Sequence, residues 1–389
     1  MVALHEDADM AGQLERTLVG AYVGSADLGE ALAIAGAVTA GDYAGWFTAW
    51  SKAAEQASAK AAEAPDEIAG RAYLRAAEYW RQSYYFLRDD LTDDRVRTGY
   101  AAQRDAFRAA FPHLEFAAEA VTIPYGGAGL PGYLFRPGSA EGPRPTVLLP
   151  GGFDDTAEER IKHGVRGALA LGWNALAWDG PGQGGVLVEQ GVTMRPDFET
   201  VLRPVVDWVV QQPGVDPEAL VLVGRSLAGY FAPRGASGEP RIKALVCDPG
   251  QYDFASRLQS MFKAGEWERV LSADPKMDEQ LQSNLEGPRN RYMYGSRMAA
   301  MGAKTYGEWI RIQANYTLEG RVGSITCPTL ITEGEGDFAS QGQQLYDALT
   351  CDKEFRKIAA ADGGGGHCCG LGQQLWTQIA FGWLEEKIA

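Results

Sequence analysis

The sequence predicts an α/β fold, in which a mostly parallel β-sheet is covered by helices, preceded by a helical region and interrupted by a helical insertion. After Phe116, short apolar runs that end in Gly, Pro or Asp alternate with helix-like segments, which is typical of a buried parallel sheet. Before Phe116, and again from Gln251 to Gly323, helical patterns replace this alternation. We expect four parts: an N-terminal helical region (residues 1–115), the first part of the core (116–250), a helical lid over the carboxyl edge of the sheet (251–323) and the second part of the core (324–389).

Three stretches before Phe116 have the spacing of amphipathic helices, at residues 41–64, 65–90 and 97–114. The first of them places Tyr43, Phe47 and Trp50 at helical spacing, with Ala, Lys and Glu between them. We interpret most of these aromatic residues as core between packed helices. Aromatic residues also suit ligand sites, so a few could line a pocket.

Short apolar runs after Phe116 predict the strands of the sheet. They are residues 119–125, 129–137, 145–152, 173–182, 219–226, 242–250, 327–337 and 354–360. Helix-like segments separate several of them, at residues 156–172, 198–212 and 342–350, and residues 375–388 indicate a closing amphipathic helix. Because parallel strands need crossover connections, usually helices, this alternation favours a mostly parallel sheet.

The composition indicates a globular protein that binds a small molecule or another protein. Of the 389 residues, 46% are hydrophobic and 22% charged, and the formal net charge is −15. An acidic average surface repels nucleic acid and anionic membranes. No apolar run approaches the length of a membrane span. We therefore predict neither a nucleic-acid partner nor a membrane partner.

The cysteines and the first residues predict a cytoplasmic, reduced protein. The five cysteines are odd in number and lie in apolar or loop contexts, which is not the pattern of a disulfide framework. The opening stretch MVALHEDADMAGQLERTL carries acids where a signal peptide has a basic segment followed by an apolar one.

The stretch VLVGRSLAGYFAP, residues 221–233, is the strongest candidate for a catalytic motif. Ser226 lies between an apolar strand and a predicted helix, with small residues at Gly224, Ala228 and Gly229. Gly-x-Ser-x-small in this context forms a sharp turn that exposes the Ser hydroxyl as a nucleophile. Gly and Ser are also ordinary turn residues, so a structural Ser is the alternative until a base is found.

A base and an acid follow in the order that this motif requires. Among the four histidines, His367 alone lies in a loop between a strand and the last helix, and neutral His can accept the Ser proton. Asp337 follows a buried strand and would hold the imidazole in the correct tautomer. Asp248, which follows the preceding strand, is the weaker alternative. The chain order Ser226, Asp337, His367 favours a hydrolytic triad.

An oxyanion hole is expected from main-chain N–H groups after the first inner strand and after the nucleophile. The stretch TVLLPGGFDDT predicts the Phe153 amide as the first donor, and the Leu227 amide is the second. Asp154 and Asp155 lie beside a region that receives negative charge. We expect either that one of them works as an acid or that Asp155 or Thr156 caps the following helix.

A glycine-rich stretch, WDGPGQGG, formally matches G-x-G-x-x-G through Gly180, Gly182 and Gly185. A dinucleotide site needs the first strand of a sheet before the motif and an amphipathic helix after it, and neither context is present. The phosphate-loop pattern is absent from the sequence, and the histidines and cysteines lack zinc spacing. We therefore predict no cofactor and no metal.

Together these segments resemble the α/β-hydrolase superfamily, and within it the branch that holds 2,6-dihydroxypseudooxynicotine hydrolase, fungal yellowish-green pigment hydrolases and FrsA-like proteins. The stretches GDYAGWFTAWSKAAEQ, AAEYWRQSYYFL, LLPGGFDDTAEER, WDGPGQGG, VGRSLAGYFAPR, CPTLITEGEGD and GGGGHCCG carry the resemblance over nearly the whole chain. It implies an N-terminal helical region and a lid that together roof the site, a homodimer, and the triad Ser226, Asp337 and His367. A Glu that assists ketone cleavage in the C–C bond hydrolase of this branch is replaced here by Asp154.

The expected function is cofactor-free serine hydrolysis of a C–C bond next to a ketone, in an aromatic or polyketide-like small molecule. Hydrolysis of an ester, lactone or thioester, and acyl transfer or cyclisation, are alternatives because they share the first half-reaction. A non-catalytic binding protein on the same scaffold is the alternative of another class. Tyr252, Trp267 and Tyr294 are candidate walls of the substrate pocket, although each is also compatible with a core position.

Overall fold

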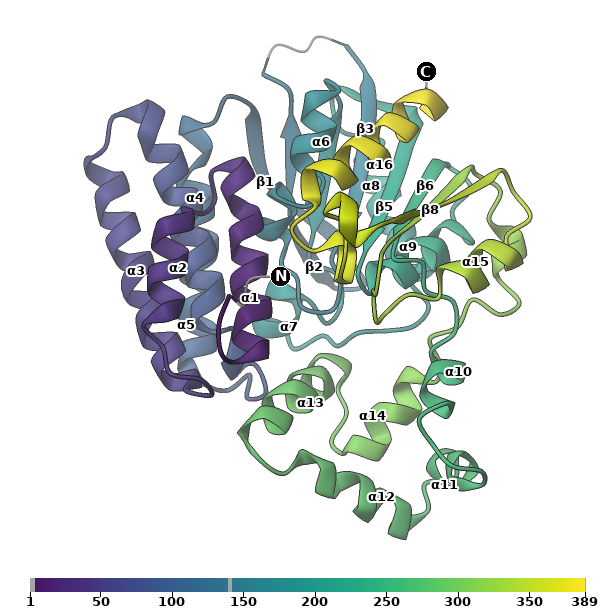
Figure 1. The fold of residues 1–389 in the computed structure, drawn as a ribbon. Coiled ribbons are helices and arrows are strands. Elements are labelled where there is room, and N and C mark those ends of the chain that lie inside the picture. The colour runs from purple at the N-terminus through teal and green to yellow at the C-terminus, as the bar shows by residue number, and fades with distance from the viewer. Residues whose placement is uncertain (1–3, 139–141, 389) are drawn as a thin grey trace.

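The computed structural model describes residues 4–138 and 142–388 and has an eight-stranded sheet at its centre (Figure 1). The strands lie in the order β1-β2-β4-β3-β5-β6-β7-β8. Their bounds are β1 Ala117–Tyr125, β2 Ala128–Arg136, β3 Arg144–Pro150, β4 Asn174–Trp178, β5 Val215–Arg225, β6 Ile242–Asp248, β7 Thr329–Gly334 and β8 Lys353–Ile358. β2 is antiparallel to β1 and to β4, and the other neighbours are parallel. The predicted mostly parallel sheet is confirmed.

Alternate side chains of each central strand point to opposite faces of the sheet, and helices bury both faces. In β5, Leu220 and Leu222 belong to one hydrophobic core, while Val221 and Val223 belong to the other. The first core is closed by α8 (Glu199–Val209), α9 (Ala228–Ala236) and much of the helical insertion. The second is closed by α6 (Val165–Ala170), α16 (Gln373–Ile388) and the N-terminal helices.

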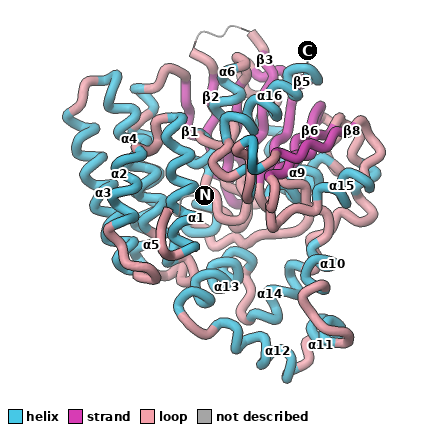
Figure 2. The backbone as a smooth tube through the Cα atoms, in the orientation of Figure 1, coloured by secondary structure: helices cyan, strands magenta, loops and turns pink. Residues whose placement is uncertain are grey.

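The N-terminal helices pack as a layer beside the sheet (Figures 1 and 2). They are α1 Ala8–Leu18, α2 Leu28–Gly36, α3 Tyr43–Glu63, α4 Asp66–Ser83 and α5 Asp94–Ala109. The buried side of α3 is formed by Trp46, Trp50 and small residues, whereas Phe47 is only half-buried. The buried face of α3 therefore starts at Trp46 and continues with Trp50, four residues later, whereas the sequence pattern placed Phe47 on this face.

The segment 156–172, expected as one helix, forms two short ones. A 3-10 turn covers Ala157–Ile161, and α6 begins at Val165. Gly164 interrupts them with a φ of 134°, and a Cβ there would lie 2.7 Å from a methyl carbon of Leu149. The break places His163 at the turn, where its Nδ1 lies 3.2 Å from the guanidinium of Arg225.

The insertion between β6 and β7 is helical and lies below the sheet edge in Figure 1. Its helices are α10 Phe254–Gln259, α11 Glu266–Leu271, α12 Pro275–Gln282, α13 Pro288–Met301 and α14 Tyr306–Gln313. We call residues 251–323 the lid. The remaining helices of the sheet layers are α7 Gly184–Val188 and α15 Gly342–Ala348. Within the described ranges, every helix is too short or too polar to cross a membrane.

Candidate active site

Ser226 lies at the turn between β5 and α9 with a φ of 56°, a backbone conformation that residues other than Gly rarely adopt. The glycines of the motif are required by close packing. A Cβ at Gly224 would lie 2.0 Å from the carbonyl oxygen of Ala228, and one at Gly229 would lie 1.9 Å from that of Pro249. The strand, the turn and the helix therefore hold the Ser hydroxyl at the carboxyl end of β5 in a strained backbone.

His367 and Asp337 meet Ser226 at this edge of the sheet. His367, between β8 and α16, has its Nε2 2.9 Å from Ser226 Oγ and its Nδ1 2.8 Å from Asp337 Oδ1. The side chain of Asp337 is fully buried, and its other carboxylate oxygen accepts a 2.8 Å bond from the Cys368 amide. If Nδ1 donates to the carboxylate, Nε2 is left to accept the Ser proton. The structure thus brings these three predicted side chains into one hydrogen-bonded chain.

Within this hydrogen-bonded group of three side chains, Asp337 is an ionised acid and His367 is a basic imidazole. Burial alone would raise the pKa of Asp337, but hydrogen bonds from His367, Cys368 and Ala339 lower it. Burial would lower the pKa of His367, but the Cys368 sulfur and the Asp337 carboxylate outweigh it and raise the pKa above its usual range. Cys368 Sγ lies 3.6 Å from His367 Nε2. The imidazole is therefore a stronger base than an isolated one.

Asp248, the alternative acid, has a different partner. It is fully buried, pairs with Arg225 at 2.8 Å and accepts a hydrogen bond from Thr332. Arg225 also donates to the carbonyl of Cys368 at 2.6 Å, and its guanidinium stacks 3.9 Å from the ring centre of Trp376. Arg225, the residue before Ser226, thus stabilises the loop that carries His367.

The loop after β3 lies directly against the nucleophile turn. A Cβ at Gly152 would lie 3.1 Å from Ser226 Cβ, so this Gly permits the close approach. The Gly152 amide donates to Asp155 at 2.9 Å. In the part of the chain that the structure describes, the amides of Phe153 and Leu227 have no hydrogen-bond partner. Both predicted oxyanion donors are therefore available.

The two acids beside this loop are neutralised by arginines from the N-terminal helices and from the loop itself. Arg88 binds Asp154 at 2.9 Å, while Arg16 and Arg160 both pair with Asp155. Burial would raise the pKa of Asp154, but the guanidiniums of Arg88, Arg297 and Arg16 hold it far below its usual range. An ionised Asp154 has no proton to donate, so this charge pattern does not favour proton donation by Asp154, and its catalytic role stays a prediction. Thr156, not Asp155, caps the next turn through its side chain and that of Glu159.

The lid and the N-terminal helices touch on one side of the site. Tyr292 of α13 packs against Tyr43, Tyr85 and Phe86, and Arg289 of α13 pairs with Asp9 of α1. These contacts join two regions far apart in the sequence.

The three predicted pocket walls, Tyr252, Trp267 and Tyr294, all belong to the lid. Trp267 is 7% exposed and packs on Phe262 inside the lid, which is the core position that the sequence also allowed, and its role as a wall stays a prediction. Tyr294 contacts the rings of Tyr306 and Trp309, and the Tyr252 amide donates to Gln341.

Phe338 is a site residue that the sequence reasoning missed. Its side chain is 78% exposed, and its ring centre lies 4.8 Å from that of His367. An exposed aromatic ring beside the His367 imidazole is suited to contact a bound small molecule. The sequence signal that could have identified Phe338 is its position directly after Asp337.

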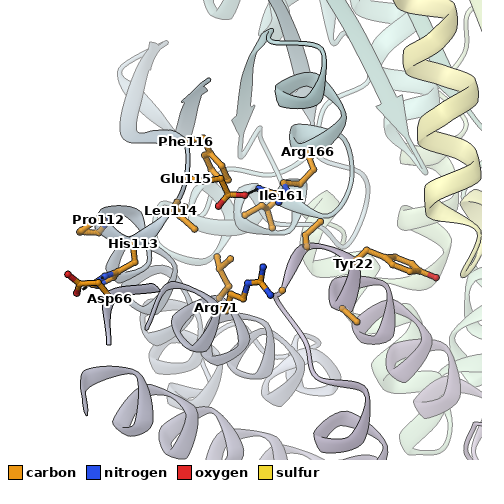
Figure 3. A pocket seen from close by; sticks show the side chains of 14 residues that line it. Tyr22, Asp66, Arg71, Pro112, His113, Leu114, Glu115, Phe116, Ile161 and Arg166 are labelled. Atoms are coloured by element: carbon orange, nitrogen blue, oxygen red, sulfur yellow. Dashed lines mark hydrogen bonds and ion pairs between the residues drawn. The ribbon is translucent and has the colours of Figure 1, made fainter. Parts of the chain in front are cut away.

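A groove of about 440 Å³ lies elsewhere, between the N-terminal helices and the start of the sheet (Figure 3). Its lining includes the charged or titratable residues Asp66, Arg71, His113, Glu115 and Arg166. Arg166 and Glu115 form an ion pair across its wall. Because none of the predicted triad or oxyanion residues lines it, we do not assign the chemistry to this groove.

Comparison with known proteins agrees with this architecture. A family model described as FrsA-like esterase matches residues 36–247. The chain is 33% identical over 397 residues to Hydrolase LUC6 of a Fusarium species, with 94% of this chain and 93% of the relative covered. It is also 33% identical over 391 residues to the 20-hydroxy-prefusarin hydrolase FUS2 of Gibberella moniliformis, again covering 94% and 93%. The fold superposes on 2,6-dihydroxy-pseudo-oxynicotine hydrolase with a TM-score of 0.74 at 22% identity, covering 96% of this chain and 95% of that one.

Proposed function

The chain belongs to the FrsA-like esterase family and is a hydrolase of the α/β type, and on that premise we propose that it is a cofactor-free serine hydrolase with Ser226, His367 and Asp337 as its triad. The observation that carries the proposal is the continuous hydrogen bonding from Ser226 Oγ through the His367 ring to Asp337. Asp337 holds the tautomer, His367 takes the hydroxyl proton, and Ser226 attacks the substrate carbonyl. The amides of Phe153 and Leu227 bind the oxygen as it becomes negative.

The substrate class that we propose is a ketone-bearing aromatic or polyketide-like molecule. Its support is the relationship to FUS2, whose name gives a prefusarin as substrate. In C–C cleavage the bond between the former carbonyl carbon of the tetrahedral adduct and the adjacent carbon breaks. The leaving fragment is an enolate, and its carbon takes a proton from the His367 imidazolium. Water activated by the same imidazole then hydrolyses the acyl-serine, so that the products are a carboxylic acid and a shortened ketone. Asp154 stays ionised against Arg88 and shapes the field beside the oxyanion loop.

Ester, lactone or thioester hydrolysis is the second candidate, and the family match favours it. A good leaving group needs no acid beyond His367, and the family model that matches is that of an esterase. Acyl transfer or cyclisation shares the acyl-serine intermediate and differs only in the nucleophile that removes it. A non-catalytic binding protein would have no use for an activated hydroxyl.

A comparison of two substrates tests the proposal. The wild type, Ser226→Ala and Asp154→Asn are assayed with a 1-aryl-1,3-diketone and with p-nitrophenyl acetate. We expect the wild type to cleave both substrates, Ser226→Ala to cleave neither, and Asp154→Asn to retain proton donation from His367 and thus at least a tenth of the diketone rate. Cleavage of the acetate alone would establish the esterase alternative. Absence of turnover and of any fluorophosphonate adduct on folded wild type would establish the binding protein.

The homodimer, the small-molecule partner and the cytoplasmic location remain predictions. Sedimentation equilibrium of the intact chain measures the first of them directly.

A further inference from the structure

Two buried glutamines contact the main chain on either side of the proposed oxyanion hole. Gln183 lies in the glycine-rich stretch after β4, and Gln251 lies after β6 at the start of the lid; each is 2% exposed. Gln183 Nε2 donates to the carbonyl oxygens of Gly151 and Gly152 at 2.6 and 2.8 Å. Gln251 Nε2 donates to the carbonyl oxygen of Ser226 at 2.6 Å.

Two of these three carbonyls, those of Gly152 and Ser226, belong to the same peptide groups as the two expected oxyanion donors. The Gly152 carbonyl and the Phe153 N–H share one peptide plane, and the Ser226 carbonyl and the Leu227 N–H share another. Both peptides are trans, so within each plane the C=O and the N–H point in opposite directions. A hydrogen bond that holds the carbonyl therefore also sets the direction of the N–H.

The position of Gln183 is itself fixed from several sides. Its Oε1 accepts a 2.9 Å bond from the Gly180 amide, and a Cβ at Gly151 would lie 2.7 Å from that same oxygen. Asp179 anchors the stretch further by accepting bonds from the amides of Gly185 and Ala157, both at 2.8 Å. Within WDGPGQGG, a Cβ at Gly184 would lie 2.0 Å from Asp179 Oδ2, and one at Gly180 would lie 3.2 Å from Gln183 Oε1. These glycines leave room for two buried polar side chains, which gives this stretch a role other than nucleotide binding.

Asp155 removes the competing donor of the same loop. It accepts the Gly152 N–H at 2.9 Å, and Arg16 and Arg160 neutralise its charge. The N–H of the next residue, Phe153, has no hydrogen-bond partner in the described part of the chain.

We propose that Gln183 and Gln251 are paired positioning residues that orient both oxyanion-hole N–H groups before substrate binds. The proposal rests on the serine-hydrolase function proposed above. Donors that are already aligned stabilise the developing charge without reorganisation during the reaction. The glutamines act through the backbone and do not touch the substrate.

Three matched variants test this role: Gln183→Met, Gln251→Met and the control Gln341→Met. Methionine keeps the length of the side chain and has no N–H donor. Gln341 also donates to a backbone carbonyl, that of Asp253 at 2.8 Å, but this peptide is not an oxyanion donor. The readouts are kcat and KM for p-nitrophenyl acetate, and the affinity for an aryl trifluoromethyl ketone, whose adduct with Ser226 carries the oxyanion.

We expect Gln183→Met and Gln251→Met to lower kcat by about 10- to 100-fold with KM changed less than threefold, since loss of one oxyanion donor costs about 100- to 1000-fold and misorientation costs less. Affinity for the trifluoromethyl ketone falls by the same factor as kcat/KM. The control stays within twofold of wild type. Gln183→Glu, which keeps the shape and the Oε1 acceptor, gives the same loss and serves if a methionine variant does not fold.

A uniform loss in all three methionine variants, or an unchanged kcat in folded Gln183→Met and Gln251→Met, would overturn the role of the glutamines. A loss confined to KM would overturn it as well. Failure of the underlying function looks different, because the wild type itself would then neither turn over nor react with a fluorophosphonate.

Discussion

Replacement of Arg225 by Met is predicted to destabilise the protein strongly, through the charge that it leaves behind. Arg225 is 4% exposed and Asp248 is fully buried, so their ion pair is shielded from water. Without the guanidinium, Asp248 keeps only the Thr332 hydroxyl as a side-chain partner in the described part of the chain. Removal of one member of a buried pair costs about 3–5 kcal/mol of unfolding free energy, because a charge is left without compensation.

The double variant Arg225→Met/Asp248→Asn separates charge from packing. It lacks the orphaned carboxylate, so we expect it to regain at least about 2 kcal/mol relative to Arg225→Met. Burial already raises the pKa of Asp248, and loss of Arg225 raises it further. A raised folded pKa means that stability is retained below the unfolded pKa and lost as pH rises through the folded value. The penalty in Arg225→Met is therefore larger at pH 8 than at pH 5.

Equilibrium unfolding in urea, followed by tryptophan fluorescence at both pH values, measures these differences. A loss below about 1 kcal/mol in Arg225→Met, or no recovery in the double variant, would refute the assignment of Arg225 as the compensating charge. A penalty that grows at low pH would refute the sign.

Three further predictions concern the site itself. The raised pKa of His367 predicts that kcat/KM increases as pH rises through an apparent pKa above 6.5, since only the neutral ring accepts the Ser226 proton. The same raised pKa means that the charged His367 ring stabilises the folded protein below the unfolded pKa. This stabilisation is lost as pH rises through the folded pKa. An apparent pKa at or below 6.5 in the pH–rate profile would contradict the raised value. Asp337→Asn is expected to lower kcat by about 10³- to 10⁴-fold through the wrong tautomer while circular dichroism stays unchanged, and a loss under tenfold would count against Asp337 as the acid. Phe338→Ala removes an exposed ring next to His367. We expect KM to rise about 3- to 10-fold for aryl esters, because about 0.5–1.5 kcal/mol of aromatic contact is lost, and to stay unchanged for acetate esters of small alcohols. An equal effect on both kinds of ester would argue against contact between Phe338 and the substrate.

Local sequence patterns are sufficient to predict the sheet and the meeting of Ser226, Asp337 and His367. The strands are short apolar runs with clear ends, and the carboxyl ends of parallel strands lie at one edge of the sheet. Ser226 directly after β5, Asp337 three residues after β7 and His367 in the loop after β8 are therefore brought together by topology. The close contact of Gly152 with Ser226 follows from the same rule, because β3 and β5 are neighbours.

The roles of polar side chains that reach across the sequence were not predictable in this way. The charge state of Asp154 is set by Arg88, which lies 66 residues earlier on another layer. Gln183 and Gln251 bond to backbone carbonyls, and such bonds have no sequence pattern because any residue offers the acceptor. The helix expected at 156–172 is broken because Gly164 must pack against Leu149, a tertiary contact that overrides helical spacing.

Rapid-quench mass spectrometry with p-nitrophenyl acetate tests the nucleophile most directly. We predict an acetyl group on the peptide that contains Ser226, formed in a burst by the wild type and absent from Ser226→Ala and His367→Ala. Continued ester hydrolysis by Ser226→Ala at the wild-type rate, or an acetyl group on Cys368 in place of Ser226, would contradict the account.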